Sequence, residues 1–292
     1  MKLALYMAFS NESTIKCCKE IIGLVSDENS LIIDSKLKKE LSVERQNEFI
    51  FFDSSGSVSN DIDYVIAVGG DGTILRSITY VKDSGIPILG INAGRLGFLT
   101  STQKENLKEG ISKIKNNEYK LIKRSLLKLE SNNDEIIFSY ALNEITIQRK
   151  DSTSMLNIAC SINGNYLTNY WSDGLIISTP TGSTGYSLSN GGSIVSPESE
   201  IIILNPIAPH NINMRSLIIP DNSKIKIDIE GNDDINLSLD SRMHSFSSKD
   251  SINISKSNFS INTIKFDDDN FYKRLREKLY WGQDLRNLEN KN

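Results

Sequence analysis

A single carboxylate stands among glycines in the stretch "GGDGT" at residues 69–73, between an apolar run and a helical pattern. Such a strand-to-helix turn presents backbone N–H groups and the positive end of a helix dipole, which favour an anion such as phosphate. Glycines let phosphate oxygens approach the main chain because no Cβ stands in the way. A carboxylate repels phosphate, so Asp71 is explained if it handles a proton or a phosphate-bound Mg²⁺. The alternative is that Asp71 only caps the helix and the glycines only form a tight turn.

A second stretch rich in polar side chains follows an apolar strand pattern at residues 171–192, "WSDGLIISTPTGSTGYSLSNGG". Five Ser and Thr hydroxyls fall within "STPTGST" at residues 178–184. Together with backbone N–H groups they offer donors to a polyol or a phosphate, and Tyr186 is available for stacking. The alternative is an ordinary polar turn. A third and weaker feature is the adjacent pair Asn143 and Glu144, of which one must point to the less exposed face of a strand.

The first hundred residues contain the elements that would position the glycine turn. Short apolar runs at residues 2–9, 63–68 and 86–92 predict buried strands, and the pattern at residues 73–85 predicts a helix. Alternating strands and helices are typical of a parallel sheet with crossover helices. Ligands bind such sheets at the carboxyl ends of the strands, which is where "GGDGT" falls.

The pattern changes after residue 100. Residues 104–124 predict one helix that leads out of the first unit, and residues 121–265 show short alternating strands separated by Asn, Ser, Asp and Gly. The C-terminal stretch at residues 270–282 predicts a helix that packs back on the first unit. Its four cations are interpreted as a solvated helix face: Lys273, Arg274, Arg276 and Lys278.

We therefore expect two domains. The first is an α/β nucleotide-binding domain with a parallel, Rossmann-like sheet, formed by residues 1–100 and completed by residues 266–292. The second, residues 101–265, is a β-rich, sandwich-like dinucleotide-binding domain.

Composition excludes several classes of function for this chain of 292 residues. The formal net charge of −4 gives no basic field for nucleic acid. No apolar run approaches the length of a membrane helix, and the N-terminus reads as a strand and not as a signal peptide. Three cysteines form no disulfide framework, and two histidines make a zinc site improbable. We expect a cytoplasmic protein with no membrane or nucleic-acid partner.

Five motifs in order closely resemble the ATP-dependent NAD kinases of bacterial type. They are "GGDGT" at 69–73, "NAGRLGFL" at 92–99, "LNE" at 142–144, "SDGLIISTPTGSTGYSLSNGG" at 172–192 and "NPIAPH" at 205–210. The resemblance covers about residues 60–220 in detail. "GGDG" alone also occurs in diacylglycerol, sphingosine and 6-phosphofructokinase relatives, so the combination with "TPTGSTGYS" carries the specificity.

The resemblance implies a kinase that transfers the γ-phosphoryl group of ATP to the 2'-hydroxyl of the adenosine ribose of NAD, giving NADP. The active site would lie between the two domains. A divalent cation, Mg²⁺ by preference, would be carried with ATP, and the protein itself would supply no metal ligand. The family implies a homodimer or homotetramer.

The resemblance also implies residue roles in the first domain. Asp71 is the general base, and Gly72 contacts the dinucleotide. The turn that faces the phosphates consists of Gly69, Gly70, Gly72 and Thr73. Arg76 reaches a phosphate or is simply an exposed helix residue, and Phe98 lines the NAD pocket or belongs to the core.

Further roles fall in the second domain. Asn143 and Glu144 hold the hydroxyls of the adenosine ribose, and Asp173 lies near the nicotinamide. The segment that wraps the adenine and ribose comprises Thr181, Thr184, Gly185, Tyr186, Ser187, Leu188 and Ser189. Many relatives have Ala where this chain has Gly185, and the smaller residue is expected to leave the site slightly looser.

Two alternatives compete with this interpretation. A lipid kinase of the diacylglycerol or sphingosine type would need an apolar channel or a membrane-facing surface, and the sequence offers no polybasic anchor for one. A non-catalytic dinucleotide-binding or sensing protein would not need Asp71.

Overall fold

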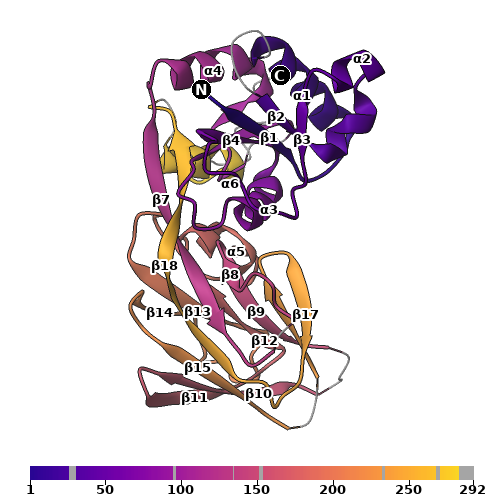
Figure 1. Cartoon of the computed structure of the whole chain (residues 1–292). Helices are drawn as coiled ribbons and strands as arrows, with labels where there is room; N and C mark the ends of the chain where they lie inside the picture. Colours follow the sequence, from indigo (N-terminus) through magenta and orange to yellow (C-terminus); the bar gives the residue numbers. More distant parts are fainter. Residues whose placement is uncertain are drawn as a thin grey trace. The chain divides into compact units, whose positions relative to one another are not determined.

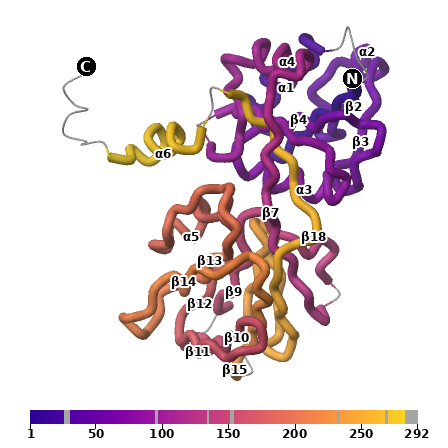
Figure 2. Tube along the Cα trace, turned by 90° about the vertical axis from the view of Figure 1, so that its left-hand side faces the viewer, coloured from indigo at the N-terminus to yellow at the C-terminus, as the bar shows by residue number. Residues whose placement is uncertain are grey.

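The computed structural model divides the chain into two compact units, Met1–Lys123 with Ile261–Asn292 and Arg124–Ser260 (Figures 1 and 2). The structure describes residues 1–25, 31–94, 97–133, 135–150, 154–231, 234–267 and 270–282. We call the first unit 1 and the second unit 2. Two strands, β7 (Lys120–Glu130) and β18 (Ile252–Lys265), pair with each other, and each has residues in both units.

Unit 1 is built on a parallel sheet. Its strands are β1 (Leu3–Met7), β2 (Leu31–Asp34), β3 (Ile50–Phe52), β4 (Tyr64–Gly69), β5 (Ile88–Asn92) and the short β6 (Thr102–Gln103). Their order is β3-β2-β1-β4-β5, with β6 beside β5. The chain runs from β1 to β2 on one side and later places β4 on the other side of β1, so the order reverses there. The carboxyl end of β4, which carries Gly69, therefore lies beside the point where ligands bind doubly wound sheets.

Helices cover both faces of this sheet. The helical segments of unit 1 are α1 (Glu12–Val25), the 3₁₀ turn η1 (Ser35–Glu40), α2 (Val43–Gln46), α3 (Asp71–Val81), the 3₁₀ turn η2 (Lys104–Asn106), α4 (Leu107–Lys115) and α6 (Phe271–Leu279). Side chains of α1 and α4 share one buried cluster with Leu3 and Leu5 of β1. Tyr6 points to the opposite face because strand side chains alternate, and there it stacks on Tyr80 of α3 at 6.0 Å between ring centroids. Unit 1 is thus a three-layered α/β fold.

Two sequence-based expectations about residues 100–124 need comment. The single helix over 104–124 is wrong, because α4 ends at Lys115 and β7 begins at Lys120. Asn117 adopts a left-handed conformation with φ 57°, which a helix cannot continue. The structure also assigns α4 to unit 1, whereas the expected boundary fell at residue 100. The reason is packing, since Leu107 and Ile111 are buried in the cluster of unit 1.

Unit 2 is a β-rich unit with one core between antiparallel layers. Its remaining strands are β8 (Tyr140–Ala141), β9 (Glu144–Arg149), β10 (Leu156–Ile162), β11 (Asn165–Ser172), β12 (Gly174–Ser178), β13 (Ile201–Ile207), β14 (Leu217–Pro220), β15 (Ile225–Glu230), β16 (Ile235–Leu239) and β17 (Arg242–Phe246). One layer runs β14-β13-β12-β9-β16-β17, and the other includes β11-β10-β15-β18. Inward side chains such as Ile147 of β9 and Ile227 of β15 join one buried cluster. Two short helical segments, η3 (Thr181–Thr184) and α5 (Tyr186–Ser189), follow β12.

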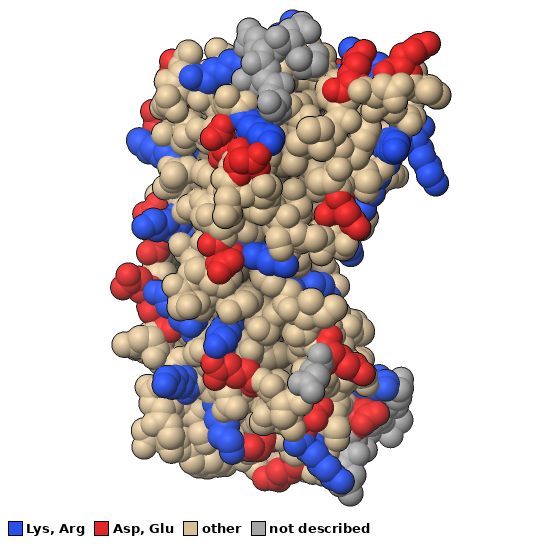
Figure 3. Space-filling model, viewed as in Figure 1, with Lys and Arg blue, Asp and Glu red and all other residues tan. Residues whose placement is uncertain are grey.

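The expected fold class, a parallel α/β unit followed by a β-rich sandwich-like unit, is confirmed. No helix within the described part of the chain is long and apolar enough to cross a membrane. Figure 3 shows Lys and Arg interspersed with Asp and Glu on the face that it draws, in keeping with the small net charge of −4.

Candidate active site

Asp71 begins α3 directly after the carboxyl end of β4. Its carboxylate accepts two backbone hydrogen bonds, from the Phe98 amide to Oδ2 at 2.7 Å and from the Leu99 amide to Oδ1 at 2.9 Å. The Lys278 ammonium of α6 lies 3.5 Å from the same Oδ2, and the Asp71 side chain remains 26% exposed. The carboxylate is therefore fixed in orientation and still open to a ligand. We call these groups the Asp71 site.

The glycines of the turn divide into two kinds. Gly69 is buried at φ 150°, and a Cβ on it would lie 2.1 Å from the Thr73 hydroxyl, so only glycine fits there. Gly70 and Gly72 are exposed, and a Cβ on either would meet nothing within 4 Å. Gly69 and the buried Thr73 thus shape the turn, whereas Gly70 and Gly72 present an accessible backbone at a helix start.

The two other candidate residues of unit 1, Arg76 and Phe98, have side chains that contact aromatic rings or a cation outside the glycine turn. Arg76 is exposed, and its guanidinium lies 4.6 Å above the Phe9 ring. Phe98 is half-buried, with its ring 6.5 Å from that of Phe271 and 4.5 Å from the Lys278 ammonium. Phe98 therefore packs on α6, and its backbone, not its ring, contacts Asp71.

Sequence reasoning missed Gly97, which lets the loop approach the carboxylate. A Cβ on Gly97 would lie 2.0 Å from Asp71 Oδ1, so any other residue would force the loop or the carboxylate to move. The only available signal was its place inside "NAGRLGFL".

Replacing Gly97 with alanine is expected to displace the Asp71 carboxylate and, because the motifs imply that Asp71 is the general base, to lower kcat by about tenfold or more. The matched control is Gly94→Ala in the same loop, where a Cβ would meet nothing within 4 Å. Steady-state kinetics of both variants test this, and equal rates for the two would contradict it.

In unit 2, Asn143 and Glu144 lie at the start of β9 and are held by a residue far along the chain. Asp240 Oδ1 accepts the Asn143 amide at 2.7 Å and the Glu144 amide at 3.3 Å, while Oδ2 accepts the Leu142 amide at 3.0 Å. The Asp240 amide in turn donates to the Glu144 carbonyl at 2.9 Å. Asp240 thus sets the backbone that carries both candidate ribose ligands.

The side chains of this pair present unused acceptors. Asn143 Oδ1 and Glu144 Oε2 are buried, and neither has a hydrogen-bond partner within the described residues. Gly185 lies against them, since a Cβ on it would be 2.8 Å from Glu144 Oε2 and 3.1 Å from Asn143 Nδ2. Two adjacent buried acceptors suit a ligand that donates hydrogen bonds, such as a diol. We call Asn143, Glu144 and Gly185 the Asn143 site.

The environment of Glu144 disfavours its charge. Burial, and then the neighbouring Asp240 carboxylate, raise the pKa of Glu144 from 4.5 to about 8, against a hydrogen bond from the Tyr186 backbone. Burial also raises the pKa of Asp240. Glu144 is therefore protonated over much of the neutral range in the absence of a ligand.

The raised pKa of Glu144 makes the free energy of unfolding depend on pH. Because the folded pKa of about 8 exceeds the ordinary 4.5, the contribution of Glu144 is most favourable below pH 4.5 and is lost as the pH rises towards 8. The free energy of unfolding of the wild type should fall across this range by a few kcal/mol relative to Glu144→Gln. Urea denaturation at several pH values measures it, with Glu135→Gln, an exposed glutamate of unit 2, as control. Parallel profiles for wild type and Glu144→Gln would refute the assignment.

The segment after β12 folds tightly over the Asn143 site. The Thr179 hydroxyl donates to the Leu142 carbonyl at 2.6 Å, and the Thr179 amide donates to the Asn143 carbonyl at 2.8 Å. A Cβ on Gly182 would lie 2.2 Å from that same carbonyl oxygen. These contacts bring the end of β12 and the start of β9 together.

The remaining candidates of this segment differ in accessibility. The Thr181 hydroxyl is buried and accepts from Arg124 at 3.3 Å, and the exposed Tyr186 accepts from Gln148 at 2.9 Å. Ser187 is buried, where its carbonyl accepts from Asn205 at 3.0 Å. Thr184, Gly185 and Leu188 are half-buried and Ser189 is exposed.

Asp173 lies at the turn between β11 and β12. Its carboxylate is 3.3 Å from the Arg149 guanidinium, and its side chain is 29% exposed. Nearby, the exposed Trp171 packs its ring 5.0 Å from that of His210, whose amide donates to the Trp171 carbonyl. Asp173 is therefore available to a ligand, although it already has one cationic partner.

No group of three or more His, Cys, Asp or Glu side chains among the described residues is arranged to hold a metal ion. Both oxygens of Asp71 already accept backbone hydrogen bonds. The described Asp71 site thus offers a single carboxylate, which suits a cation that is bound mainly by substrate phosphates.

Comparison with known proteins agrees with the motifs. Residues 26–119 match the model of the ATP-NAD kinase N-terminal domain, and residues 142–266 match that of the ATP-NAD kinase C-terminal domain. The chain is 44% identical to an NAD kinase of Flavobacterium psychrophilum and 41% identical to one of Flavobacterium johnsoniae. Each match covers 98% of this chain and all of the relative.

Solved structures agree as well. A yeast NADH kinase complexed with NADH superposes with a TM-score of 0.86 at 26% identity, covering 98% of this chain and 89% of that one. An NAD kinase from Archaeoglobus fulgidus in complex with ATP gives a TM-score of 0.73 at 26% identity, over 96% and 98% of the two chains. With the matches of both domain models and of full-length relatives, the chain belongs to the NAD kinase family.

Proposed function

We propose that the protein transfers the γ-phosphoryl group of ATP to the 2'-hydroxyl of the adenosine ribose of NAD, with Asp71 as general base. The family supports this, and so do the relatives solved with NADH and with ATP. The observation that carries the residue assignment is the Asp71 carboxylate, which is oriented by two backbone amides at a glycine turn and still 26% exposed. A residue that only capped α3 would not need amides from a second loop.

In the proposed reaction, Asp71 accepts the proton of the 2'-hydroxyl as its oxygen attacks the γ-phosphorus. A new P–O bond forms to the ribose, the bond to the bridging oxygen breaks, and ADP leaves with the electron pair. Phosphoryl transfer depends mainly on positioning and charge neutralisation, so one carboxylate near the nucleophile is sufficient. The open backbone at Gly70 and Gly72, at the start of α3, would bind phosphate oxygens. Arg76 would reach a phosphate only by leaving the Phe9 ring.

A divalent cation, Mg²⁺ by preference, is proposed to enter with ATP as part of that substrate. Mg²⁺ typically keeps several waters and binds substrate phosphates with only one or two carboxylates. Kinase chemistry requires such a cation to offset the charge on the triphosphate. Chelation by EDTA should abolish activity, and Mg²⁺ should restore it.

For NAD, Asn143 Oδ1 and Glu144 Oε2, which have no partner among the described residues, would hydrogen-bond with the adenosine ribose hydroxyls, each of which can donate or accept. The segment Thr181–Ser189 would wrap the adenine and ribose, with the exposed Tyr186 available for stacking. Asp173 would lie near the nicotinamide, where its charge is shared with Arg149. Phe98 is proposed to border the pocket at the Asp71 site.

The test is direct. The purified protein is incubated with ATP, Mg²⁺ and NAD, and NADP is measured by an NADP-specific dehydrogenase, with ADP formed in equal amount. Phosphorylated diacylglycerol or sphingosine without NADP would instead support a lipid kinase. No product from any substrate would support a non-catalytic dinucleotide-binding protein.

We also propose a cytoplasmic homodimer or homotetramer. Three buried free cysteines, Cys17, Cys18 and Cys160, suit a reducing compartment. Strand β11 stands at the end of its layer and exposes Tyr166 and Trp171, which are residue types enriched at protein interfaces. Light scattering after gel filtration would give the assembly, and a monomer would contradict this proposal.

A further inference from the structure

The C-terminal helix α6 differs from the expected solvated helix face. Arg276 and Lys273 are exposed as expected, but Arg274 is only 7% exposed. An arginine is rarely buried unless its guanidinium is paired or hydrogen-bonded. The expectation is therefore wrong for Arg274, and its burial needs an explanation.

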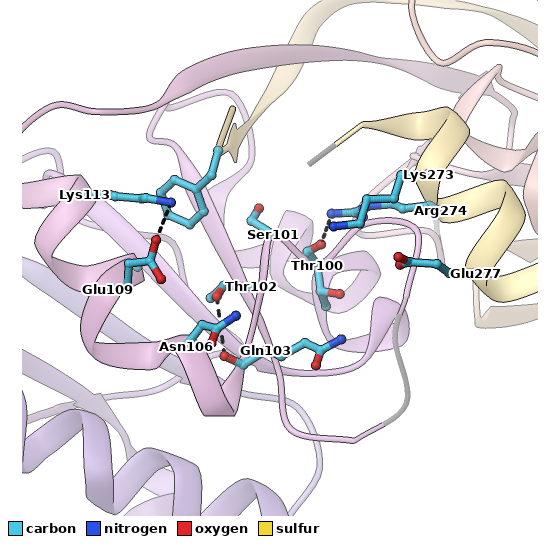
Figure 4. Close-up of a pocket in the computed structure, with 12 residues that line it drawn as sticks. Thr100, Ser101, Thr102, Gln103, Asn106, Glu109, Lys113, Lys273, Arg274 and Glu277 are labelled. Atoms are coloured by element: carbon cyan, nitrogen blue, oxygen red, sulfur yellow. Dashed lines mark hydrogen bonds and ion pairs between the residues drawn. The ribbon is translucent and has the colours of Figure 1, made fainter. Parts of the chain in front are cut away.

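Arg274 hydrogen-bonds to the loop whose amides bind the Asp71 carboxylate. Its guanidinium donates to the carbonyls of Phe98 and Thr100, and more weakly to that of Gly97 at 3.4 Å. Figure 4 shows the guanidinium directed at Thr100. These residues lie in a loop that has no strand or helix ladder to satisfy its carbonyls. Arg274 supplies the donors, and such charge-assisted hydrogen bonds are stronger than neutral ones.

The same loop turns its amides towards the carboxylate. Phe98 gives its carbonyl to Arg274 and its amide to Asp71, and the Leu99 amide binds the other oxygen of Asp71. A continuous chain of hydrogen bonds thus runs from α6 through the loop to the proposed general base. Peptide planarity makes the chain stiff, because fixing a carbonyl also fixes the amide of the next residue.

Lys278 adds a second contact from the same helix. It lies four residues after Arg274, on the same helix face, with its ammonium 3.5 Å from Asp71 Oδ2 and 4.5 Å from the Phe98 ring. The pair is partly exposed, so its Coulomb energy is screened, and its main effect is on geometry.

The loop also has space into which it could move. A cavity of about 230 Å³ lies against Arg274 and Thr100, and polar side chains such as Gln103, Glu109 and Lys113 line it (Figure 4). Packing alone therefore does not hold the loop on this side.

We infer that Arg274 is a positioning residue, which fixes loop 97–100 so that its amides orient the Asp71 carboxylate, with Lys278 as an auxiliary contact. The catalytic consequence rests on the proposed function of Asp71. The structural consequence, a fixed loop 97–100, does not depend on that function. Loss of Arg274 leaves two to three loop carbonyls without their donor and lets the amides turn away from Asp71.

The first experiment uses the ligand-free protein and does not depend on activity. Hydrogen exchange of the Phe98 and Leu99 amides is measured by NMR in wild type, Arg274→Ala and Arg276→Ala. Arg274→Ala should raise the exchange rates of these two amides by about tenfold or more, since it removes charge-assisted bonds from the same peptides. Arg276→Ala, an exposed arginine of the same helix, should leave them unchanged. Unchanged rates in Arg274→Ala would overturn the inference.

The second experiment measures the catalytic consequence. Arg274→Ala should lower kcat for NADP formation by about 10- to 100-fold with KM for ATP and NAD changed less than about threefold, because positioning of the base is lost and binding is retained. Arg274→Lys should recover part of kcat. In an Asp71→Asn background, Arg274→Ala should cost no further activity, since both act through one group.

The outcomes separate the two proposals. A full additional loss in the Asp71→Asn background, or equal losses in kcat and substrate affinity, would overturn the positioning role. If the wild type is inactive but Arg274→Ala still speeds exchange of the Phe98 and Leu99 amides, the proposed function is contradicted. The structural role of Arg274 in fixing loop 97–100 is then still supported.

Discussion

Replacing Asp71 with asparagine is expected to lower kcat for NADP formation by about 10²- to 10⁴-fold, the usual contribution of a general base. The amide cannot accept the proton of the ribose hydroxyl, although it nearly matches the carboxylate in size. The structure adds a second cost, because both oxygens of Asp71 accept backbone amides and the Asn NH₂ group would face one of those donors. It would also lose the Lys278 contact. KM for ATP should change little.

The matched control is Asp83→Asn, an exposed aspartate just beyond the end of the same helix. It should retain wild-type kinetics. Circular dichroism and thermal unfolding of both variants distinguish loss of chemistry from loss of fold. Full activity in a folded Asp71→Asn protein would remove Asp71 from the mechanism and would favour a role as helix cap.

The sequence was sufficient for local features and for features shared with the family. Buried apolar runs predicted the parallel strands, and the glycine turn was correctly expected at a strand end before a helix. The adjacent pair Asn143 and Glu144 was a weak feature from which only one side chain on the less exposed face was expected, and the structure places Glu144 as a buried residue at the start of β9. The resemblance to NAD kinases was confirmed by both domain models.

Contacts between segments that are far apart along the chain could not be predicted from the sequence. Arg274 looks like any cation on a polar helix, and nothing local indicates that its guanidinium meets carbonyls 174–177 residues earlier in the chain. Gly97 appears as one glycine among several, and only the position of Asp71 shows why no Cβ fits. Strand β7 replaces the last part of the expected helix from residue 120 onward, and it was hidden because Lys120, Leu121, Lys123 and Arg124 are all compatible with a helix. Tertiary context overrides weak local propensity in such places.

The sequence around Asp240 could have predicted the local turn but not the long-range contacts of its carboxylate. It lies between β16 and β17 with φ 53°, a left-handed conformation that Asp tolerates in two-residue hairpin loops. Turn chemistry could therefore have predicted the hairpin. It could not have predicted that the carboxylate accepts the amides of Leu142, Asn143 and Glu144, some 96–98 residues away.

Asp240→Asn is expected to lower kcat/KM for NAD by about 100-fold and to destabilise the protein by about 1–3 kcal/mol. An Asn oxygen can replace Oδ1 and accept the Asn143 and Glu144 amides, but its NH₂ group then faces the Leu142 amide, which loses its acceptor. The start of β9 must shift, and the proposed ribose ligands Asn143 Oδ1 and Glu144 Oε2 move with it. KM for ATP should be nearly unchanged, because the Asp240 carboxylate contacts the amides at the start of β9 and the Arg242 guanidinium at 3.9 Å, and none of these groups is a proposed ATP-binding residue.

The pH dependence gives this prediction a second readout. The Asp240 carboxylate contributes to the raised pKa of Glu144, so its neutral replacement should bring that pKa down from about 8 towards 4.5, while burial keeps it above the ordinary value. The loss of stability between pH 4.5 and 8 should then be smaller in Asp240→Asn than in the wild type. Asp228→Asn, an exposed carboxylate of unit 2, serves as control and should behave as the wild type. If Asp240→Asn kept wild-type kcat/KM for NAD and the wild-type pH profile of stability, Asp240 would be a turn residue without influence on the Asn143 site.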